Sequence, residues 1–215
     1  MKKNLFFAVS NDITFDQRMR RICTTLARAG YDVTIAGRKR NVQTENNFEF
    51  KIKRFSCIFN SGKLFYAELN IRIFLYLIFK KFDALCAIDL DTAMGVYLAA
   101  KMKSIPFGID AHEYFQEVPE VVNRKKIKKI WEWVGRKTIP KTTFRYTVSE
   151  SLAKEFESLY HVKFEVVRNV PVFIPPVEAD YNAPFVLYQG ALNDGRGLET
   201  LIRSAPLLDI PIKIA

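Results

Sequence analysis

The alternation of short apolar runs with longer helical segments constrains the fold of this chain more than any other feature. A continuous apolar run is typical of a strand covered on both faces, and one occurs at residues 5–10; strands are also expected at residues 31–37, 83–89 and 105–110. Further strands are expected at residues 48–55, 144–149 and 164–169, and helices at 63–81, 92–103, 125–138 and 149–160. An additional helix follows the first strand, with an apolar stripe formed by Met19, Ile22, Cys23 and Leu26. Strands that alternate with helices predict crossover connections, a parallel sheet and an α/β fold.

The sequence divides into a long N-terminal part and a short C-terminal part. Residues 171–184 contain four prolines and no periodicity, which indicates an interdomain linker. Residues 1–170 are expected to form one domain, and residues 185–215 a strand, a helix and a second strand. A single unit of this kind does not bury both faces of a sheet. Residues 185–215 are therefore expected to pack poorly, to lean on the first domain, or to be covered by further chain.

A cluster of polar residues follows the strand expected at residues 105–110. Asp110, His112 and Glu113 lie where the strand ends, and ligands of open α/β sheets bind beyond the carboxyl ends of the strands. A histidine there can donate or accept a hydrogen bond or carry charge near neutral pH; the alternative is a histidine that only ties down its own loop. No second histidine or cysteine is close in sequence, which makes a metal site the weaker hypothesis.

The loop after the first strand is a second candidate for contact with a ligand. It lacks the G-x-G-x-x-G pattern of dinucleotide-binding sites. Asp12, Asp16 and Arg18 are able to contact a polar ligand there, although helix capping and solvation account for them equally well. Asp16 and Ser149 are expected to cap the starts of their helices, and Gly30 to end one in the left-handed conformation.

A glycine-rich turn precedes the helix expected in the C-terminal part. Gly190 ends a strand, and Gly195, Arg196 and Gly197 open the helix. Backbone N–H groups at the start of a helix favour anions, and arginine adds a bidentate donor for phosphate. Such turns are common, so the pattern alone predicts a phosphate site only moderately well.

Basic residues are concentrated on the helix expected at residues 125–138, in a chain with a formal charge of +10. Two hypotheses account for them: an amphipathic helix on an anionic membrane surface, or a core-packed helix with a solvated basic face. The membrane-surface candidates are Lys125, Lys126, Lys128, Lys129, Trp131, Trp133, Arg136 and Lys137. A nucleic-acid partner is not expected, because aromatic residues are not interleaved with the charges on several strands.

The remaining composition indicates a cytoplasmic protein. Its three cysteines are widely spaced and form no C-x-x-C pair, which fits a reducing compartment. The apolar run near the N-terminus is too short for a signal peptide, and residues 73–79 are too few to cross a bilayer. We expect a cytoplasmic location, with attachment to the inner face of the cell membrane as an option.

Several motifs, taken in order, resemble those of bacterial glycosyltransferases of family 4. They are NDITFDQRMRRICTTLARAGYDVTIAGR, DAHEYFQEVPE, WEWVGRKTIPK, YTVSESLA, EVVRNVP and YQGALNDGRGLETLI, and together they cover nearly the whole chain. The resemblance implies the GT-B architecture, in which two Rossmann-like, doubly wound parallel sheets face each other across a cleft. It also implies retaining transfer from a nucleotide-sugar to an acceptor, without a catalytic metal or other cofactor. The net charge and the basic helix favour a lipid-linked or polysaccharide acceptor.

The resemblance also assigns roles to particular residues. His112 matches a histidine that contacts the transferred sugar, with Asp110 and Glu113 beside it, and Arg196–Gly197 matches part of the basic clamp on the donor diphosphate. Ala191 stands where the family has the first basic residue of that clamp, after Gly190. The family's downstream pair of glutamates has no counterpart before Ala215. Residues 1–215 alone are therefore expected to be inactive; the alternative is a non-catalytic module that binds an anionic membrane surface or polymer.

Overall fold

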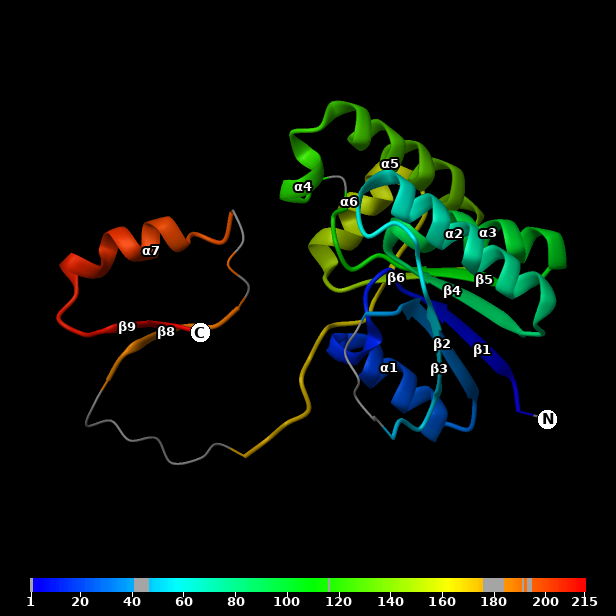
Figure 1. Ribbon diagram of the computed structural model, residues 1–215, viewed down its shortest axis with the longest axis horizontal. Helices are drawn as coiled ribbons and strands as arrows, with labels where there is room; N and C mark the ends of the chain where they lie inside the picture. Colours follow the sequence, from blue (N-terminus) through cyan, green and yellow to red (C-terminus); the bar gives the residue numbers. More distant parts are fainter. Residues whose placement is uncertain (1, 41–46, 116, 176–183, 191, 193–194) are drawn as a thin grey trace. The chain divides into compact units, whose positions relative to one another are not determined.

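The computed structural model describes residues 2–40, 47–115, 117–175, 184–190, 192 and 195–215 (Figure 1). Contacts within the chain divide it into two compact units, Met1–Asn169 and Val170–Ala215. Among the described residues, no helix combines the length and the hydrophobicity that crossing a membrane requires.

The first unit is built on a sheet of seven parallel strands in the order β3-β2-β1-β4-β5-β6-β7. The strands are β1 (Asn4–Ala8), β2 (Asp32–Arg38), β3 (Lys51–Phe55), β4 (Ala84–Ile88), β5 (Phe107–Asp110), β6 (Phe144–Thr147) and β7 (Glu165–Val166). The order reverses between β1 and β4, as in the Rossmann fold. The α/β class and the doubly wound parallel sheet predicted for this part of the chain are confirmed.

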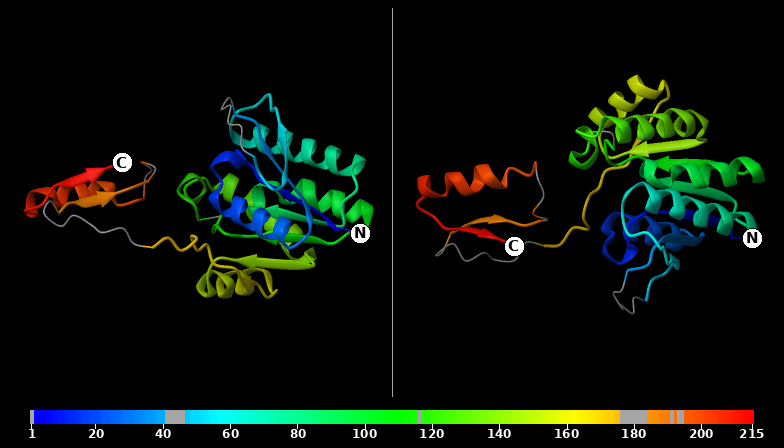
Figure 2. Two further views of the ribbon diagram at one scale, coloured as in Figure 1. Left: turned by 90° about the horizontal axis from the view of Figure 1, so that it is seen from below. Right: turned by 45° about the horizontal axis from the view of Figure 1, so that its top comes forward.

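Helices cover both faces of this sheet (Figure 1, Figure 2). The helices of the unit are η1 (Ile13–Phe15), α1 (Gln17–Arg28), α2 (Gly62–Phe79), α3 (Asp89–Lys103), α4 (Pro119–Val122), α5 (Lys125–Thr138), η2 (Ile139–Lys141) and α6 (Glu150–Tyr160). Buried side chains of α1 pack with one face of the sheet, and those of α2, α3, α5 and α6 belong to the core on the other. This division into two cores is the reason that the central strands are apolar along their whole length.

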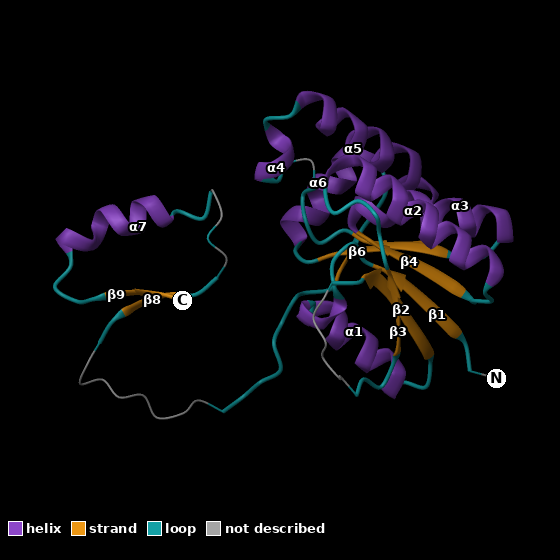
Figure 3. Cartoon of the chain, viewed as in Figure 1, coloured by secondary structure: helices purple, strands orange, loops and turns teal. Residues whose placement is uncertain are grey.

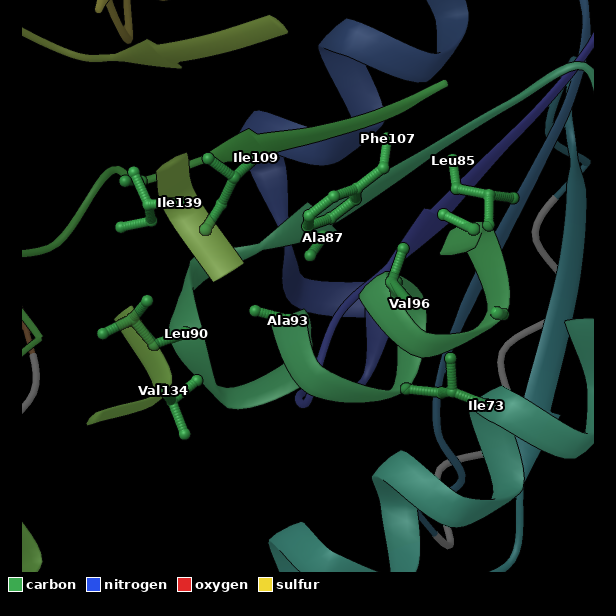
Figure 4. Close-up of a cluster of buried hydrophobic side chains, with 14 of the residues drawn as sticks. Ile73, Leu85, Ala87, Leu90, Ala93, Val96, Phe107, Ile109, Val134 and Ile139 are labelled. Carbon is green, nitrogen blue, oxygen red and sulfur yellow. The ribbon is translucent and has the colours of Figure 1, made fainter. Parts of the chain in front are cut away.

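The larger core is centred on α3, whose apolar residues interlock with β4, β5, α2 and α5 (Figure 4). Close approach of α2 and α3 depends on Gly95, because a Cβ atom there would lie 2.4 Å from the backbone oxygen of Asn70. Asn70 reinforces the contact by accepting a 2.7 Å hydrogen bond from the Gly95 N–H and donating one of 2.6 Å to the Asp91 carbonyl. The two helices are therefore joined by both packing and hydrogen bonds.

Most expected elements and caps are present, with differences at their ends. The helix predicted at residues 125–138 is α5, and Asp16, Gly30 and Ser149 take their predicted capping positions. The strands predicted at 48–55 and 164–169 are shorter, because they lie at the two edges of the sheet and pair on one side only. The helix predicted from residue 92 begins at Asp89, which has a positive φ of 55°.

The second unit is one strand–helix–strand motif (Figure 3). It consists of β8 (Val186–Tyr188), α7 (Leu198–Ser204), η3 (Ala205–Leu207) and β9 (Ile212–Ile214), and β8 and β9 are parallel. No residue of α7 is buried. The motif therefore has the topology predicted for residues 185–215. Its helix is poorly covered, because a single strand–helix–strand unit has too little chain to bury it.

Candidate functional site

Polar side chains gather at the carboxyl edge of the first unit's sheet. All seven strands are parallel, so the loops after β1, β4 and β5 leave the sheet at the same edge. These three strands are neighbours and flank the point where the strand order reverses, which is where open α/β sheets bind ligands. The site has three parts: the His112 loop, an acidic cluster, and a buried ion pair beneath them.

Asp89 holds the loop that carries His112. Its Oδ1 accepts hydrogen bonds from the N–H groups of His112, at 3.0 Å, and Glu113, at 3.2 Å. Its Oδ2 lies 3.2 Å from His112 Nδ1, an ion-pair distance at an angle outside hydrogen-bond geometry. Nδ1 is buried, whereas 26% of the His112 side chain stays exposed. The ring therefore turns Nδ1 inward, and Nε2 is the nitrogen left for a ligand.

The backbone of Asp89 is strained to make these contacts. A φ of 55° is uncommon for residues other than glycine, although aspartate and asparagine tolerate it best. Such strain of roughly 1–3 kcal/mol persists where surrounding structure enforces it, and it is concentrated at functional sites. Here the two backbone hydrogen bonds to the His112 loop supply that enforcement.

Asp89 and Asp91 form a buried acidic cluster with the exposed Glu113 beside it. Burial, followed by the nearby charges of Asp91 and Glu113, raises the pKa of Asp89 well above its usual range. Burial also raises the pKa of Asp91 to about 7, against a hydrogen bond from Ser10 that favours the ionised form. Both carboxyl groups are therefore more readily protonated than an ordinary aspartate, because burial disfavours their charged forms.

Arg18 and Asp110 form a buried ion pair beneath the loop. Arg18 Nε and Nη2 donate to the two Asp110 carboxylate oxygens at 3.0 Å each, and Nη1 donates to the Val167 carbonyl at 3.1 Å. Their side chains are 6% and 0% exposed. Burial raises the pKa of Asp110, and the hydrogen bonds and charge of Arg18 oppose that rise. Both side chains are buried against each other, which supports a positioning role for them, and their contact with a ligand stays a prediction.

The other two acids of the first loop also serve local structure. Asp12 accepts hydrogen bonds from the N–H groups of Thr14, at 3.0 Å, and Arg40, at 3.1 Å. Burial alone would raise the pKa of Asp12, but these hydrogen bonds outweigh it and lower the pKa. Asp16 caps α1 by accepting from the Met19 N–H at 2.9 Å. The contacts of Asp12 and Asp16 therefore agree with the capping hypothesis for these residues.

The basic helix α5 has both a buried and an exposed face. Trp131 is only 8% exposed and packs edge-on against Tyr66 and Phe115. Most of its ring is therefore packed in the core, and the part that remains accessible lines the groove between α2, α3 and α5. Lys128 is half-buried and pairs with Glu117. The remaining candidates are exposed, namely Lys125, Lys126, Lys129, Trp133, Arg136 and Lys137.

The glycine-rich turn of the second unit has the backbone geometry that glycine permits. Gly195 and Gly197 have φ values of 80° and 73°, and Gly197 is the residue that precedes α7. Gly190 also has a positive φ, and Arg196 is exposed. Ala191, where the family pattern has a basic residue, lies outside the described residues. The turn therefore leaves Arg196 open to solvent between two glycines in the left-handed conformation.

Comparison with known families decides the class of the protein. The family model described as Glycosyltransferase Family 4 matches residues 17–176. The chain belongs to glycosyltransferase family 4. Among proteins of curated function, none matches this family 4 chain in sequence.

Solved structures agree with this fold. A sucrose-phosphate synthase from Thermosynechococcus elongatus superposes with a TM-score of 0.76 at 12% identity, over 99% of this chain and 62% of that one. The glycosyltransferase SsfS6 of Streptomyces sp. SF2575, complexed with thymidine diphosphate, superposes with a TM-score of 0.59 at 12% identity, over 99% of this chain and 68% of that one. S. aureus MnaA with UDP superposes with a TM-score of 0.57 at 14% identity, over 100% of this chain and 63% of that one. At these identities the likeness shows the GT-B type of fold, and the chain spans 62% of the synthase's length.

The sequence analysis missed Asp89 and Asp91 as site residues. Both follow β4, the strand that pairs with β1 and β5 at the switch point. The sequence feature that could have indicated them is the pair of acids directly after an apolar strand, because buried carboxylates at that edge need partners. The His112 loop thus has a supporting carboxylate, Asp89, that the histidine motif alone does not reveal.

Proposed function

We propose that the protein is a retaining glycosyltransferase that transfers a sugar from a nucleotide-sugar to a lipid-linked or polysaccharide acceptor in cell-surface glycan synthesis. The observation that carries this proposal is the Asp89-supported His112 loop at the carboxyl edge of a family 4 domain. His112 would contact hydroxyl groups of the transferred sugar through Nε2. Glu113, exposed beside it, is the neighbouring carboxylate at the reacting end.

The second unit would supply the donor side of the site. Neighbouring structures contain thymidine diphosphate in SsfS6 and UDP in MnaA, which supports a nucleoside diphosphate donor. Gly190, Arg196 and Gly197 would contact its phosphates, since exposed arginine and open backbone N–H groups suit an anion. We assign no metal or other cofactor to the reaction. Activity would belong to the complete gene product, and residues 1–215 alone would be inactive.

Membrane attachment is the second candidate function. Six of the α5 candidates are exposed, and they carry five positive charges with Trp133 among them. Such a face suits an anionic surface of the cytoplasmic leaflet. A protein that only bound this surface, without sugar transfer, would be the non-catalytic alternative, and a peripheral position on the inner face of the membrane is compatible with both.

Product analysis tests the proposed reaction. The complete gene product is incubated with UDP- and GDP-sugars and a lipid extract, and the new linkage is read by NMR. We expect nucleotide release coupled to a glycoside that keeps the anomeric configuration of the donor. An inverted product would contradict retention, and lipid binding with no turnover of any donor would favour the non-catalytic alternative.

A further inference from the structure

An apolar groove of about 440 Å³ lies on the outer face of the first unit, between α2, α3 and α5. Its walls include Ile71 and Phe74 of α2, Met94 and Leu98 of α3, and Ile130 of α5. Leu90 and Val134, which lie side by side in the core view, also line it (Figure 4). Its size is that of a small-molecule site, which is typically about 300–1,000 Å³ and mostly apolar.

The lining is mostly apolar, and the side chain of Asn70 within it already has hydrogen-bond partners. The Asn70 amide donates to the carbonyls of Tyr66 and Asp91 and accepts from the Gly95 N–H. Lys63, in the first turn of α2, is the remaining charged residue of the lining and is exposed. An occupant that matches this groove is therefore apolar along its length.

The apolar surface continues beyond the groove along α2 and α3. Ile71 is 58% exposed and is followed one turn later by the exposed Leu75, and Leu98 is followed by the exposed Met102. Soluble proteins seldom expose contiguous apolar surface of this kind without a partner. No described residue of the first unit covers it.

Positive charge borders the same groove. Ile130, 50% exposed, has Lys126 four residues before it, and Trp133 and Lys137 three and seven residues after it. Residues at these spacings share one side of a helix, so this side of α5 alternates lysine with apolar groups. That combination suits the interface of an anionic bilayer, where tryptophan and lysine anchor a protein beside buried apolar chains.

We propose that the groove between α2, α3 and α5 binds the hydrocarbon chain of an anionic membrane lipid, whose headgroup contacts Lys63 and Lys126. Charge favours this occupant over a second copy of the chain, because a two-fold interface at this face would bring the same basic residues of both copies together. The site is separate from sugar transfer, since its lining includes neither His112 nor Glu113. Such a site is more specific than surface attachment by α5, because the hydrocarbon chain of the lipid occupies a defined groove.

The two tryptophans of the chain allow a direct test. Trp131 lines the groove and Trp133 is on its rim, so Trp133→Phe leaves Trp131 as the only tryptophan reporter. Residues 1–215 carrying this change are mixed, without nucleotide, with phosphatidylglycerol vesicles whose acyl chains are brominated or unmodified. We expect binding at low salt and loss of Trp131 emission with the brominated lipid only, because bromine quenches by contact.

Matched variants separate the groove from the basic rim. Ala67 is an exposed lining residue, and Ala67→Phe should fill the groove and abolish the quenching while vesicle binding persists. Lys63→Gln with Lys126→Gln should weaken vesicle binding about 30-fold, since each basic residue near an anionic surface contributes about fivefold. The control, Lys125→Gln with Arg136→Gln, removes equal charge from the opposite side of α5 and should weaken binding less.

Three results would overturn the proposal. One is binding to the brominated vesicles without loss of Trp131 emission; another is equal quenching in the Ala67→Phe variant, whose folding is checked by circular dichroism. The third is a concentration-dependent dimer that Ala67→Phe abolishes, which would make the groove a subunit interface. Because no sugar or nucleotide is present, a negative result here leaves the proposed transferase activity unaffected.

Discussion

Replacing Arg18 with methionine would leave the fully buried carboxylate of Asp110 without its cation. The structure sets the size of the effect: two 3.0 Å hydrogen bonds to Asp110 and one of 3.1 Å to the Val167 carbonyl are lost together. Breaking a buried ion pair by removing one partner costs about 3–5 kcal/mol. We therefore expect the free energy of unfolding to fall by about 4 kcal/mol at pH 7, within that same range.

Urea unfolding measures this loss. With a slope of about 2 kcal/mol per molar urea, the midpoint should fall by about 2 M. The double variant, Arg18→Met with Asp110→Leu, removes both charges and should recover most of the stability, because an apolar pair of similar volume replaces the ion pair. Arg21→Met is the matched control, since Arg21 donates only to the Asn169 side chain at an exposed position.

The loss should also depend on pH. Burial already raises the pKa of Asp110, and Arg18 opposes that rise, so the pKa rises further in the Arg18→Met variant. The folded variant then takes up a proton as pH falls, and its deficit against the wild type shrinks in acid. A deficit below about 1 kcal/mol at pH 7, as for a surface pair, would refute the positioning role of Arg18, as would a deficit that grows in acid.

Three further predictions concern the same unit. Because burial raises the pKa of Asp91 from 3.8 to about 7, the folded state holds a proton between these pH values that the unfolded state has lost. The free energy of unfolding should therefore decline as pH rises from about 4 to about 7. Asp91→Asn should flatten that decline, as measured by the midpoint of urea unfolding at each pH. Gly95→Ala should lower the melting temperature by about 5 °C, since the new Cβ would meet the Asn70 backbone and such overpacking costs about 1–3 kcal/mol. Asp89→Asn should stay within about 1 kcal/mol of wild type, whereas Asp89→Ala should lose about 2–4 kcal/mol in urea unfolding, because alanine keeps the strain and removes the oxygen that accepts both hydrogen bonds.

The class of fold was predictable because apolar runs and helical periodicity report burial directly. Strands buried on both faces leave continuous runs such as residues 83–89, and caps such as Asp16 and Ser149 leave local signals. Edge strands such as β7 pair on one side only, so the sequence pattern overstated their length.

The site was predictable only in part, because its contacts join residues far apart in sequence. Arg18 and Asp110 are 92 residues apart, and their pairing depends on the order of the strands. Asp89 holds His112 across 23 residues by hydrogen bonds that no local pattern encodes. Trp131 shows the same limit. Helical spacing placed it correctly on the apolar face of α5, but its burial depends on contacts with Tyr66 and Phe115, which are distant in sequence.

The most direct test of the proposed function compares the chain's two histidines in a sugar-transfer assay on the complete gene product. His112→Ala should lower kcat/KM by about 10–100-fold, since losing one hydrogen bond to a polar ligand costs about 1.5–3 kcal/mol. His161, which ends α6 in the left-handed conformation, is the control, and His161→Asn should leave the rate within about twofold because asparagine tolerates that conformation. Unchanged turnover in His112→Ala, with the fold intact, would contradict the assignment of the active site to the carboxyl edge around His112.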